Sequence, residues 1–478
     1  MKRIHMAALA TVAFLAGCMN VGPDYVRPNA DTPQQWPGEY AKDPIPEQWW
    51  KTYGDPVLDS MVDEALSYNA DLRLAIARVD EMRARLGISR ADQYPGVSAT
   101  GAAARNRSSQ DSAAGVPAGV DPVNDNYRAT LGVAYEIDFW GKYRRASEAA
   151  RADLLGAQAN REAVRLTLIA DAVQAYFNLR ALDAQLEVTK RTVSTRLAST
   201  ALQRLRFEAG VASEFDLRQI EAQAAQAQAL QPDIERRIAQ QENALAVLLG
   251  RSPRLIVGQA LDRGTAIDAI TSPPAVPAGL PSDLLERRPD LRQAEQQLIA
   301  SNARIGQAKA AYYPSISLSG FLGGESATLS NLFNAPARIW QFSASAAQTV
   351  FDAGRIGSQV DAAQARERQA LAQYQLAIQN AFRETLDALI AQRKARETSE
   401  AEQRRAEALD RALTLAQLRY DNGVSSLLDV LDVERGLLDA EINRIEAKRA
   451  QLAATTDLFK ALGGGWQDEA RTAAADRD

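Results

Sequence analysis

The sequence predicts a mainly α-helical chain with four β-strands, which consists of two similar repeats and forms long coiled-coil helices. Two observations predict this fold class. A set of short motifs recurs at one fixed spacing, and the hydrophobic period changes from about 3.6 to 2 ahead of each long helical stretch. In addition, no apolar run after residue 17 is long enough for a transmembrane helix, which limits how such a chain could cross a bilayer.

The duplication is indicated by paired motifs that lie 213 residues apart (Gly210 against Gly423). The segment RFEAGVAS at 206–213 recurs as RYDNGVSS at 419–426. Two long helices joined by a tight turn would preserve such a spacing, whereas loops would not. The same offset relates two further pairs of dipeptides: Gly141-Lys142 with Gly354-Arg355, and Leu249-Gly250 with Leu462-Gly463.

Each repeat is predicted to contain one very long helix and one returning helix. Residues 144–207 and 358–420 contain no Pro and are rich in Ala, Gln, Glu, Arg and Leu, which favours one helix each. At 1.5 Å per residue, about 60 residues make a rod of roughly 90 Å. The returning helices are predicted over 213–250 and 426–462.

The second returning helix carries an apolar seam, while the first contains a proline. In the second, apolar residues are spaced by seven, as in a coiled coil. In the first, Pro232 is expected to break or kink the helix. Shorter helices near 57–92 and 282–312 are expected to lead into the repeats. The seam consists of Leu431, Leu438, Ile445, Leu452 and Phe459.

Two β-hairpins, 96–139 and 315–351, are predicted ahead of the long helices. Apolar Leu131 and Val133 alternate with small or polar neighbours, and Ile316, Trp340 and Phe342 lie in similar alternating runs. Such alternation predicts a lipid-facing side and a wet side. A water-soluble pair of hairpins on a coiled coil is the alternative. The strands are expected near 96–105, 127–139, 315–323 and 339–351.

Four strands cannot close a barrel that encloses a channel, and an open sheet edge in lipid leaves backbone groups unsatisfied. Closure therefore requires more than one copy. Three copies would give twelve strands, an even number within the usual range of membrane β-barrels. The sequence thus predicts a membrane β-barrel shared by a homotrimer.

The N-terminus predicts export. Lys2 and Arg3 precede an apolar run over 6–16, which is shorter than the ~20 residues of a membrane span. Residues 1–17 are therefore expected to be a signal peptide. The remaining chain would carry 53 basic residues (55 less Lys2 and Arg3) against 60 acidic, a balance that argues against nucleic acid as a partner.

Cys18 is the expected lipidation site. It is the only cysteine of the sequence and follows Leu15-Ala16-Gly17, which resembles the processing box of bacterial lipoproteins. The alternative is an ordinary cleaved signal followed by an accidental cysteine. Met19 is not the Asp that retains such lipoproteins at the inner membrane, so the resemblance implies the outer membrane.

The predicted mature chain lacks the residues that most enzymes use. The only histidine, His5, lies in the signal peptide. Without His or a free Cys, histidine acid–base catalysis, cysteine nucleophiles and the common zinc sites are excluded. We therefore expect no enzyme, no metal site and no cofactor other than the lipid on Cys18.

At this point the chain resembles the TolC-like outer-membrane efflux family, in particular its lipoprotein (NodT-type) branch. The matching segments are VGPDY at 21–25, Trp49-Trp50, LERRPDL at 285–291, AKAAYYPSISL at 308–318 and the paired turn motifs. The resemblance covers nearly the whole mature chain. It implies a homotrimer with a twelve-stranded barrel in the outer membrane and a periplasmic α-barrel of long helices. It also implies docking to a periplasmic adaptor and an inner-membrane pump, and export of small molecules such as drugs.

The resemblance also assigns residues to the periplasmic tip. The two turns would contact the adaptor, although a simple helix C-cap also explains their glycines. Asp216 and Tyr420 would support the tip. The expected adaptor-contact residues are Gly210, Val211, Ala212, Gly423, Val424 and Ser425.

Asp429 and Asp432 are the expected pore gate. Their i, i+3 spacing places both on one helix face, so three chains would present six carboxylates to the lumen. Ser426-x-x-Asp429 also reads as a capping pattern, as does Ser213-x-x-Asp216, which gives Asp429 a purely structural explanation. The gate prediction therefore rests more on Asp432.

One position departs from the family pattern. Some members close the tip with an Arg two residues after the turn glycine, paired with the carboxylate that matches Asp216. Here that position is Ser425, so closure is expected to use other contacts, involving Arg218, Arg419 or the aperture carboxylates alone.

The remaining segments are given supporting roles. Residues 18–56 are expected to form a lipidated extended arm that packs on an irregular belt at 251–281. The two repeats would then span 57–250 and 282–463, and the tail 464–478 would be disordered.

Two further readings stay open. One is a lipid-anchored coiled-coil scaffold without a pore, which shares everything except the alternating strands. The other is the outer-membrane conduit of a type I protein secretion system, which the sequence does not separate from small-molecule efflux.

Overall fold

The structure, a computed structural model, describes residues 20–36, 45–111, 116–117, 119–258, 260–271, 273 and 281–465. The predicted signal peptide, Cys18 and nearly all of the predicted tail lie outside these residues. The chain folds as two compact units. The sheet unit comprises Met1–Asn29, Val79–Gly156 and Ala294–Tyr374, and the helical unit comprises Ala30–Arg78, Ala157–Gln293 and Gln375–Asp478.

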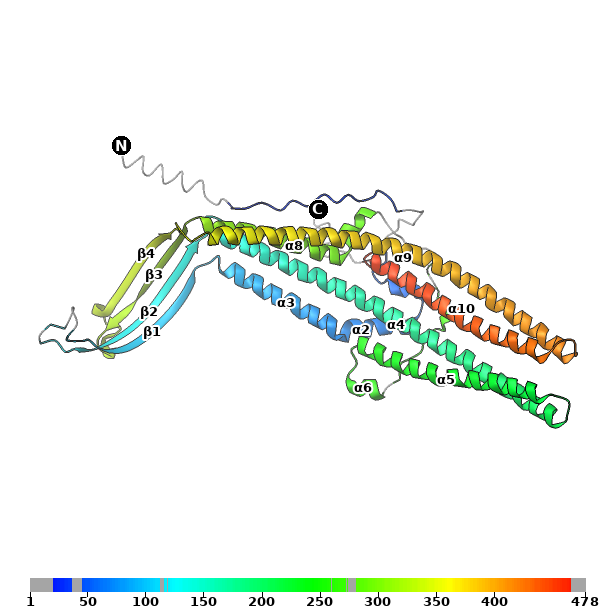
Figure 1. The fold of residues 1–478 in the computed structure, drawn as a ribbon. Coiled ribbons are helices and arrows are strands. Elements are labelled where there is room, and N and C mark those ends of the chain that lie inside the picture. The colour runs from blue at the N-terminus through cyan, green and yellow to red at the C-terminus, as the bar shows by residue number, and fades with distance from the viewer. Residues whose placement is uncertain are drawn as a thin grey trace. The chain divides into compact units, whose positions relative to one another are not determined.

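The elements follow one another in the same order in both repeats (Figure 1). Each repeat has two leading helices where the sequence predicted one, then a β-hairpin, a helix of 67 residues and a returning helix of 35 residues. The first repeat contains α2 (Pro56–Tyr68), α3 (Ala70–Ala91), β1 (Gly96–Arg107), β2 (Val123–Ile137), α4 (Lys142–Glu208) and α5 (Glu214–Leu248). The second contains α7 (Leu284–Arg287), α8 (Pro289–Lys309), β3 (Ser315–Ser326), β4 (Arg338–Ala347), α9 (Arg355–Asp421) and α10 (Leu427–Ala461).

The four strands form one antiparallel sheet in the order β1-β2-β3-β4. β4 ends at Ala347, earlier than the predicted 351. The reason lies in Asp352, whose carboxylate accepts hydrogen bonds from the backbone N–H groups of Gly354 and Ile356. This capping turns the chain into α9 three residues before the predicted start at 358.

The sequence suggested one helix over 57–92. In the structure Asn69 interrupts this segment and divides it into α2 and α3. The Asn69 Oδ1 accepts hydrogen bonds from the N–H groups of Asp71 and Leu72, at 2.8 and 3.0 Å, and so caps α3. Its Nδ2 donates to the Leu248 carbonyl. Asn69 is buried, and its side chain bonds three backbone groups. These bonds take the place of the helical hydrogen bonds that are lost where the helix is interrupted.

The expected break at Pro232 is wrong, because α5 is unbroken from Glu214 to Leu248. Proline removes the N–H that would bond the carbonyl four residues earlier, at Gln228. Both Pro232 and Gln228 are exposed, so water can satisfy the freed carbonyl. The helix therefore tolerates the residue.

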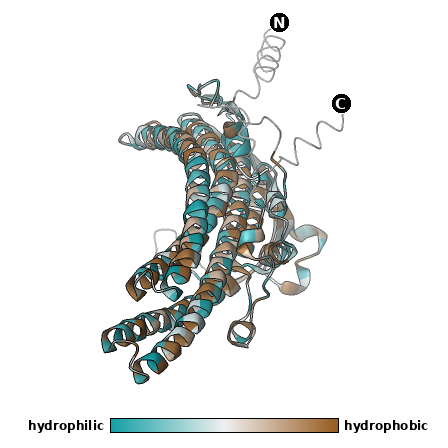
Figure 2. Ribbon diagram, turned by 90° about the vertical axis from the view of Figure 1, so that its right-hand side faces the viewer, coloured by the Kyte–Doolittle hydropathy of each residue, from teal (hydrophilic) through white to brown (hydrophobic). Residues whose placement is uncertain are grey.

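The apolar seam of α10 is confirmed. Its five predicted residues are at most 6 % exposed. No helix among the described residues combines the length and apolarity needed to cross a membrane. Polar and apolar residues are instead interspersed along the helices (Figure 2).

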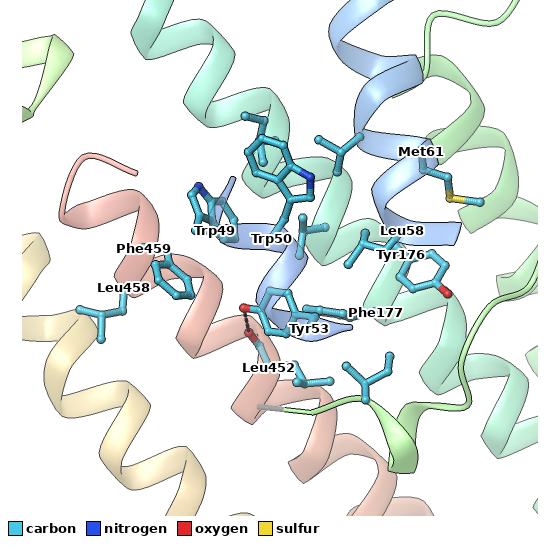
Figure 3. Packing of buried hydrophobic residues seen from close by; sticks show 14 of the residues in the cluster. Trp49, Trp50, Tyr53, Leu58, Met61, Tyr176, Phe177, Leu452, Leu458 and Phe459 are labelled. Carbon is cyan, nitrogen blue, oxygen red and sulfur yellow. Dashed lines mark hydrogen bonds between the residues drawn. The ribbon is translucent and has the colours of Figure 1, made fainter. Parts of the chain in front are cut away.

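The main hydrophobic core lies in the helical unit, around two tryptophans of the N-terminal segment. Trp49 stacks on Phe459 of α10, with ring centroids 4.9 Å apart, and Tyr53 meets the edge of Phe177 of α4 at the same distance (Figure 3). The Tyr53 hydroxyl hydrogen-bonds the Thr456 hydroxyl at 2.8 Å. The segment before α2 thus joins the returning helix of one repeat to the long helix of the other.

Asp55 is a buried polar hub beside this core. Its Oδ1 accepts the N–H groups of Val57 and Leu58, which caps α2. Its Oδ2 accepts the Tyr176 hydroxyl at 2.5 Å and the Thr265 N–H at 3.0 Å. Burial, together with this bond, raises the pKa of the Tyr176 hydroxyl. One carboxylate therefore connects α2, α4 and the 251–281 segment.

The arm and the belt differ from expectation in part. Asp55 does contact the belt, but the arm begins in the sheet unit. There the Arg145 guanidinium, only 3 % exposed, binds the Asp24 carboxylate at 2.7 Å and donates to the Val21 and Gly22 carbonyls. The belt is also less irregular than predicted, because Pro253–Gly258 forms the short helix α6.

We predict that Asp55→Ala lowers the free energy of unfolding by about 2–4 kcal/mol. The substitution removes a helix N-cap, and it leaves a buried hydroxyl and a backbone N–H without their acceptor. Thermal unfolding followed by circular dichroism measures the loss. Asp63→Ala, at an exposed position of the same helix, is the control and should change little. Equal melting temperatures for the two variants would contradict the role of Asp55.

Candidate functional site

The strand register gives the sheet one apolar face. Directly opposed residues share a face, so Val97 lies with Val133 and Leu322 lies with Leu131 and Trp340. These side chains are largely exposed in the single chain, Trp340 by 72 %. The apolar face consists of Val97, Ala99, Leu131, Val133, Tyr135, Ile137, Ile316, Leu318, Leu322, Trp340 and Phe342. An exposed apolar sheet face of this length suits lipid.

The opposite face is mainly polar, with Phe321 and Ile339 as its large apolar residues. Thr100 hydrogen-bonds Thr130 across β1 and β2, and Ser319 hydrogen-bonds Ser343 across β3 and β4. Arg128 lies over the Phe321 ring and within 3.8 Å of the Glu325 carboxylate. The predicted alternation is therefore confirmed on β2, β3 and β4, and the two faces differ as a membrane-facing and a water-facing wall would.

Both outer strands of the sheet lack a second partner among the described residues. β1 pairs only with β2, and β4 pairs only with β3. Each outer strand therefore presents unpaired N–H and C=O groups along its length. A free edge of ten or more residues is a template for pairing with another strand.

The turn after each long helix has the same geometry. The Gly210 N–H bonds the Phe207 carbonyl and the Val211 N–H bonds the Arg206 carbonyl, both at 2.9 Å. This is a Schellman motif, and Gly210 supplies its left-handed residue with φ of +75°. The second turn repeats both bonds at Tyr420–Gly423 and Arg419–Val424, with φ of +70° at Gly423.

Apolar residues near the turns are exposed in matching pairs. Val211 and Val424, within the turns, are 75 and 64 % exposed. The other pairs at the 213-residue offset, each member at least 55 % exposed, are Leu202 with Leu415, Leu205 with Leu418, and Phe215 with Leu428. We name these eight residues the tip patch. Their exposure in both repeats is a feature of a surface that another molecule covers.

Asp216 and Asp429 both cap helices. The Ser213 hydroxyl accepts the Asp216 N–H and donates to the Asp216 carboxylate. Ser426 and Asp429 form a complete capping box, in which Asp429 Oδ2 accepts the Ser426 N–H at 2.9 Å. The structure therefore contains the helix cap that the Ser426-x-x-Asp429 pattern predicted.

Asp432 has a different environment. It belongs to no cap, and its side chain is 65 % exposed. Its carboxylate forms an ion pair with Arg435, one turn further along α10. The sequence analysis missed Arg435, although the i, i+3 spacing of opposite charges is a usable signal.

The two turns are joined by Arg206 and Tyr420. The Arg206 guanidinium donates to the Tyr420 hydroxyl at 3.1 Å and lies 5.7 Å from its ring centre. Arg218, one of the residues expected to help closure, instead pairs with Glu214 and Glu221 of its own helix. Within this chain Arg206 is one link between the hairpins, beside the apolar contact of Leu217 and Ile220 with Leu431, and its role was not predicted from the sequence.

A buried arginine lies deeper in the hairpins. Arg196 of α4 is 2 % exposed and donates to the Gln223 carbonyl at 2.9 Å, while its Nε and Nη2 have no hydrogen-bond partner among the described residues. Burial lowers the pKa of this guanidinium and raises that of the Glu434 carboxyl. No sequence signal predicted that the Arg196 and Glu434 side chains would be removed from solvent, because this depends on packing between the hairpins.

Nothing in the described part of the chain groups three or more His, Cys, Asp or Glu residues as metal ligands. The predicted site residues in this part of the chain cap helices, form ion pairs or hydrogen bonds, or lie on the surface. Cys18, the predicted lipidation site, lies outside the described residues.

Comparison with known proteins identifies the family. Residues 61–251 and 280–464 match the family described as outer membrane efflux protein, which covers both repeats. The chain belongs to the outer membrane efflux protein family. Its location in the outer membrane follows from this membership.

The relatives match over their full length. The chain is 35 % identical to the probable efflux pump outer membrane protein TtgC of Pseudomonas putida, over 97 % of this chain and 96 % of that protein. It is 31 % identical to the probable outer membrane lipoprotein SilC of Salmonella typhimurium, over 98 and 100 %. Among solved structures, the CmeC outer membrane channel of Campylobacter jejuni matches with a TM-score of 0.89 and 26 % identity, over 96 and 98 %.

We predict that Gly423→Ala loosens the second turn. A Cβ at a left-handed residue costs about 1–2 kcal/mol. Amide hydrogen exchange around 419–426 should therefore accelerate. Gly436→Ala is the matched control, because it lies within α10 with no neighbour closer than 3.6 Å to the added Cβ and should stabilise the helix by up to about 1 kcal/mol. Unchanged exchange in Gly423→Ala would contradict the turn's dependence on glycine.

Proposed function

We propose that three copies of this chain form the exit duct of a tripartite efflux system in the outer membrane. The observation that carries the proposal is a sheet with one apolar face, one polar face and two open edges, attached to helices of 67 residues. A lipid-facing wall, a wet interior and a long periplasmic extension are the parts that such a duct requires.

Closure of the sheet supports the trimer. In hydrocarbon, unpaired backbone groups at β1 and β4 cost several kcal/mol each, so every edge must find a partner. β1 of one copy would pair with β4 of the next. Three sheets of four strands would then make a closed wall of twelve, which is large enough for a channel.

The tip patch supports docking of a periplasmic adaptor. Its eight exposed apolar residues lie beside the two glycine turns, where a partner's helices can approach closely. Turn residues Gly210 to Ala212 and Gly423 to Ser425 would form the centre of this contact. An inner-membrane pump would act through the adaptor. The duct itself would catalyse nothing and hold no cofactor.

The class of cargo is proposed from the relatives. Proteins named as toluene, solvent and antibiotic efflux pump components are 35–36 % identical to this chain. Small apolar or amphiphilic toxic molecules are therefore the proposed substrates, in preference to secreted proteins. A pore-free scaffold is disfavoured because it would have no use for the exposed apolar face of the sheet.

A covalent lipid on Cys18 would add a second membrane attachment. The anchor would assist insertion and leave the barrel as the main membrane element, because the sheet would span the bilayer whereas the lipid would enter only one leaflet. Incorporation of labelled palmitate by the wild type, and its loss in Cys18→Ser, tests this assignment.

The gate is proposed at Asp432. Asp429 is engaged by the capping box, so three Asp432 side chains form the expected ring. Each is paired with Arg435, which makes the ring close to neutral at rest. The aperture would therefore be narrowed by three ion pairs, and its charge would depend on how firmly each Arg435 holds its partner.

We predict ion conductance when the purified full-length protein is reconstituted in planar bilayers, because three sheets would enclose a water-filled interior. In mild detergent its mass should correspond to three copies. Trimers without conductance would favour the scaffold. A monomeric or dimeric mass would contradict closure by three sheets.

The gate has its own prediction. Asp432→Ala should lower cation selectivity, because Arg435 is left unpaired, and should raise conductance by releasing the ion pair. Asp233→Ala is the matched control, since Asp233 forms an equivalent exposed pair with Arg236 on α5, at 2.5 Å. If Asp432→Ala raised neither conductance nor permeability to large antibiotics, the gate would not be at Asp432.

A further inference from the structure

A cationic pocket lies in the sheet unit, between the last turn of α3 and the first turns of α4. Its volume is about 400 Å³, within the range of small-molecule sites. Arg90, Gln93 and Tyr94 line it from the α3 side, and Arg144, Ser147, Glu148 and Arg151 line it from α4. We name these seven residues the junction pocket.

The charges of the junction pocket are unbalanced. Its one carboxylate, Glu148, is held by the Arg145 guanidinium at 2.8 Å. Arg144 is engaged by Asp138. Arg90 and Arg151 form no ion pair with any residue in the described ranges, so two guanidinium groups remain available at the pocket.

The neutral groups of the pocket are held in place by hydrogen bonds within the protein. Gln93 donates to the Ser147 hydroxyl at 2.5 Å and to the Tyr143 carbonyl at 3.5 Å, and the Ser147 hydroxyl donates to the Ser89 carbonyl at 3.0 Å. The donors that remain for a ligand are therefore those of the arginines. Guanidinium groups bind phosphate through paired N–H donors, so two of them suit an anion with several oxygens.

The pocket adjoins the end of the sheet. Tyr94 stands two residues before β1, and α4 begins five residues after β2 ends. At the same end Trp140 stacks on Tyr313, with ring centroids 4.6 Å apart, and donates to the Pro314 carbonyl. Such aromatic groups concentrate at membrane interfaces, where lipid phosphates lie.

The second repeat has the same strand–helix junction without the pocket's α4 residues. At the 213-residue offset, Arg144, Ser147 and Arg151 are replaced by Gly357, Val360 and Gln364. The junction can therefore fold without these groups. A role in folding alone does not explain why the first repeat gathers them.

We infer that the junction pocket binds the phosphate of an anionic phospholipid from the periplasmic leaflet of the outer membrane. The inference rests on the proposed placement of the sheet in that membrane. Arg90 and Arg151 supply the charge and the N–H donors, and the hydrogen-bonded Gln93 and Ser147 side chains form a fixed part of the pocket wall. The lipid would hold the first repeat's strand–helix junction at the membrane surface.

The test uses the purified full-length protein and native mass spectrometry during titration with phosphatidylglycerol, phosphatidylcholine or inorganic phosphate. Each arginine near an anionic surface contributes about a fivefold factor in affinity, so R90Q/R151Q should bind phosphatidylglycerol roughly 25-fold more weakly. R83Q/R85Q is the matched control. It removes the same charge from exposed positions of α3 that pair with Asp80 and Glu81, and should bind as the wild type does.

Further variants and ligands distinguish a lipid headgroup from free phosphate, and a lipid site from a contact between copies of the chain. R90K/R151K, which keeps the charge, should retain most of the binding. Preference for phosphatidylglycerol over both other ligands supports the inference. Equal binding of inorganic phosphate, or an unchanged R90Q/R151Q, overturns it. Dissociation of the R90Q/R151Q trimer also overturns it, because the arginines would then serve a contact between copies. Conductance of the same variants distinguishes a failed lipid site from a failed channel assignment.

Discussion

The outer strands β1 and β4 have no second partner among the described residues, and their unpaired backbone groups constrain the rest of the structure. A backbone without water must satisfy its own hydrogen bonds, so a sheet of four strands is unfinished in a bilayer. The register already separates an apolar face from a polar one, and that separation is useful only once the sheet encloses a space. If the sheet lies in the bilayer as proposed, its outer strands require pairing with strands of further copies of the chain.

The helical unit solves a different problem, since helices of 67 residues need tertiary packing to be held in one arrangement. The N-terminal segment supplies the missing connection. Trp49 and Tyr53 fill the space between α4 and α10, and Asp55 ties α2 to α4 and to the segment after α5. Further along, Leu217 and Ile220 of α5 pack on Leu431 of α10, and Arg206 donates to the Tyr420 hydroxyl. Both contacts join the two hairpins near their turns, while the apolar tip patch stays exposed.

The sequence predicted the periodic parts of this architecture and missed those that depend on one side chain. A fixed 213-residue offset located both turns, and alternation located both faces of the sheet. It did not show that Asn69 would divide a helix, because the competing side-chain bonds involve Leu248, far along the chain. Pro232 was misjudged because its effect depends on whether the freed carbonyl meets water. The burial of Arg196 likewise depends on packing that no local pattern records. The capping role of Asp429 was foreseen from a four-residue motif; the pairing of Asp432 with Arg435 was not.

The duplication also shows where the two halves were free to diverge. Positions that shape the backbone kept their residue, as Gly210 and Gly423 did, and Ser213 and Ser426. Several positions that carry charge did not: Arg196 stands opposite Leu409, Arg151 opposite Gln364, and Asp432 opposite Gln219, although Asp216 and Asp429 match. A gene that copies its scaffold in this way can alter the electrostatics of one copy while the other preserves the geometry. Such a chain can acquire new chemistry in one half without first risking its fold.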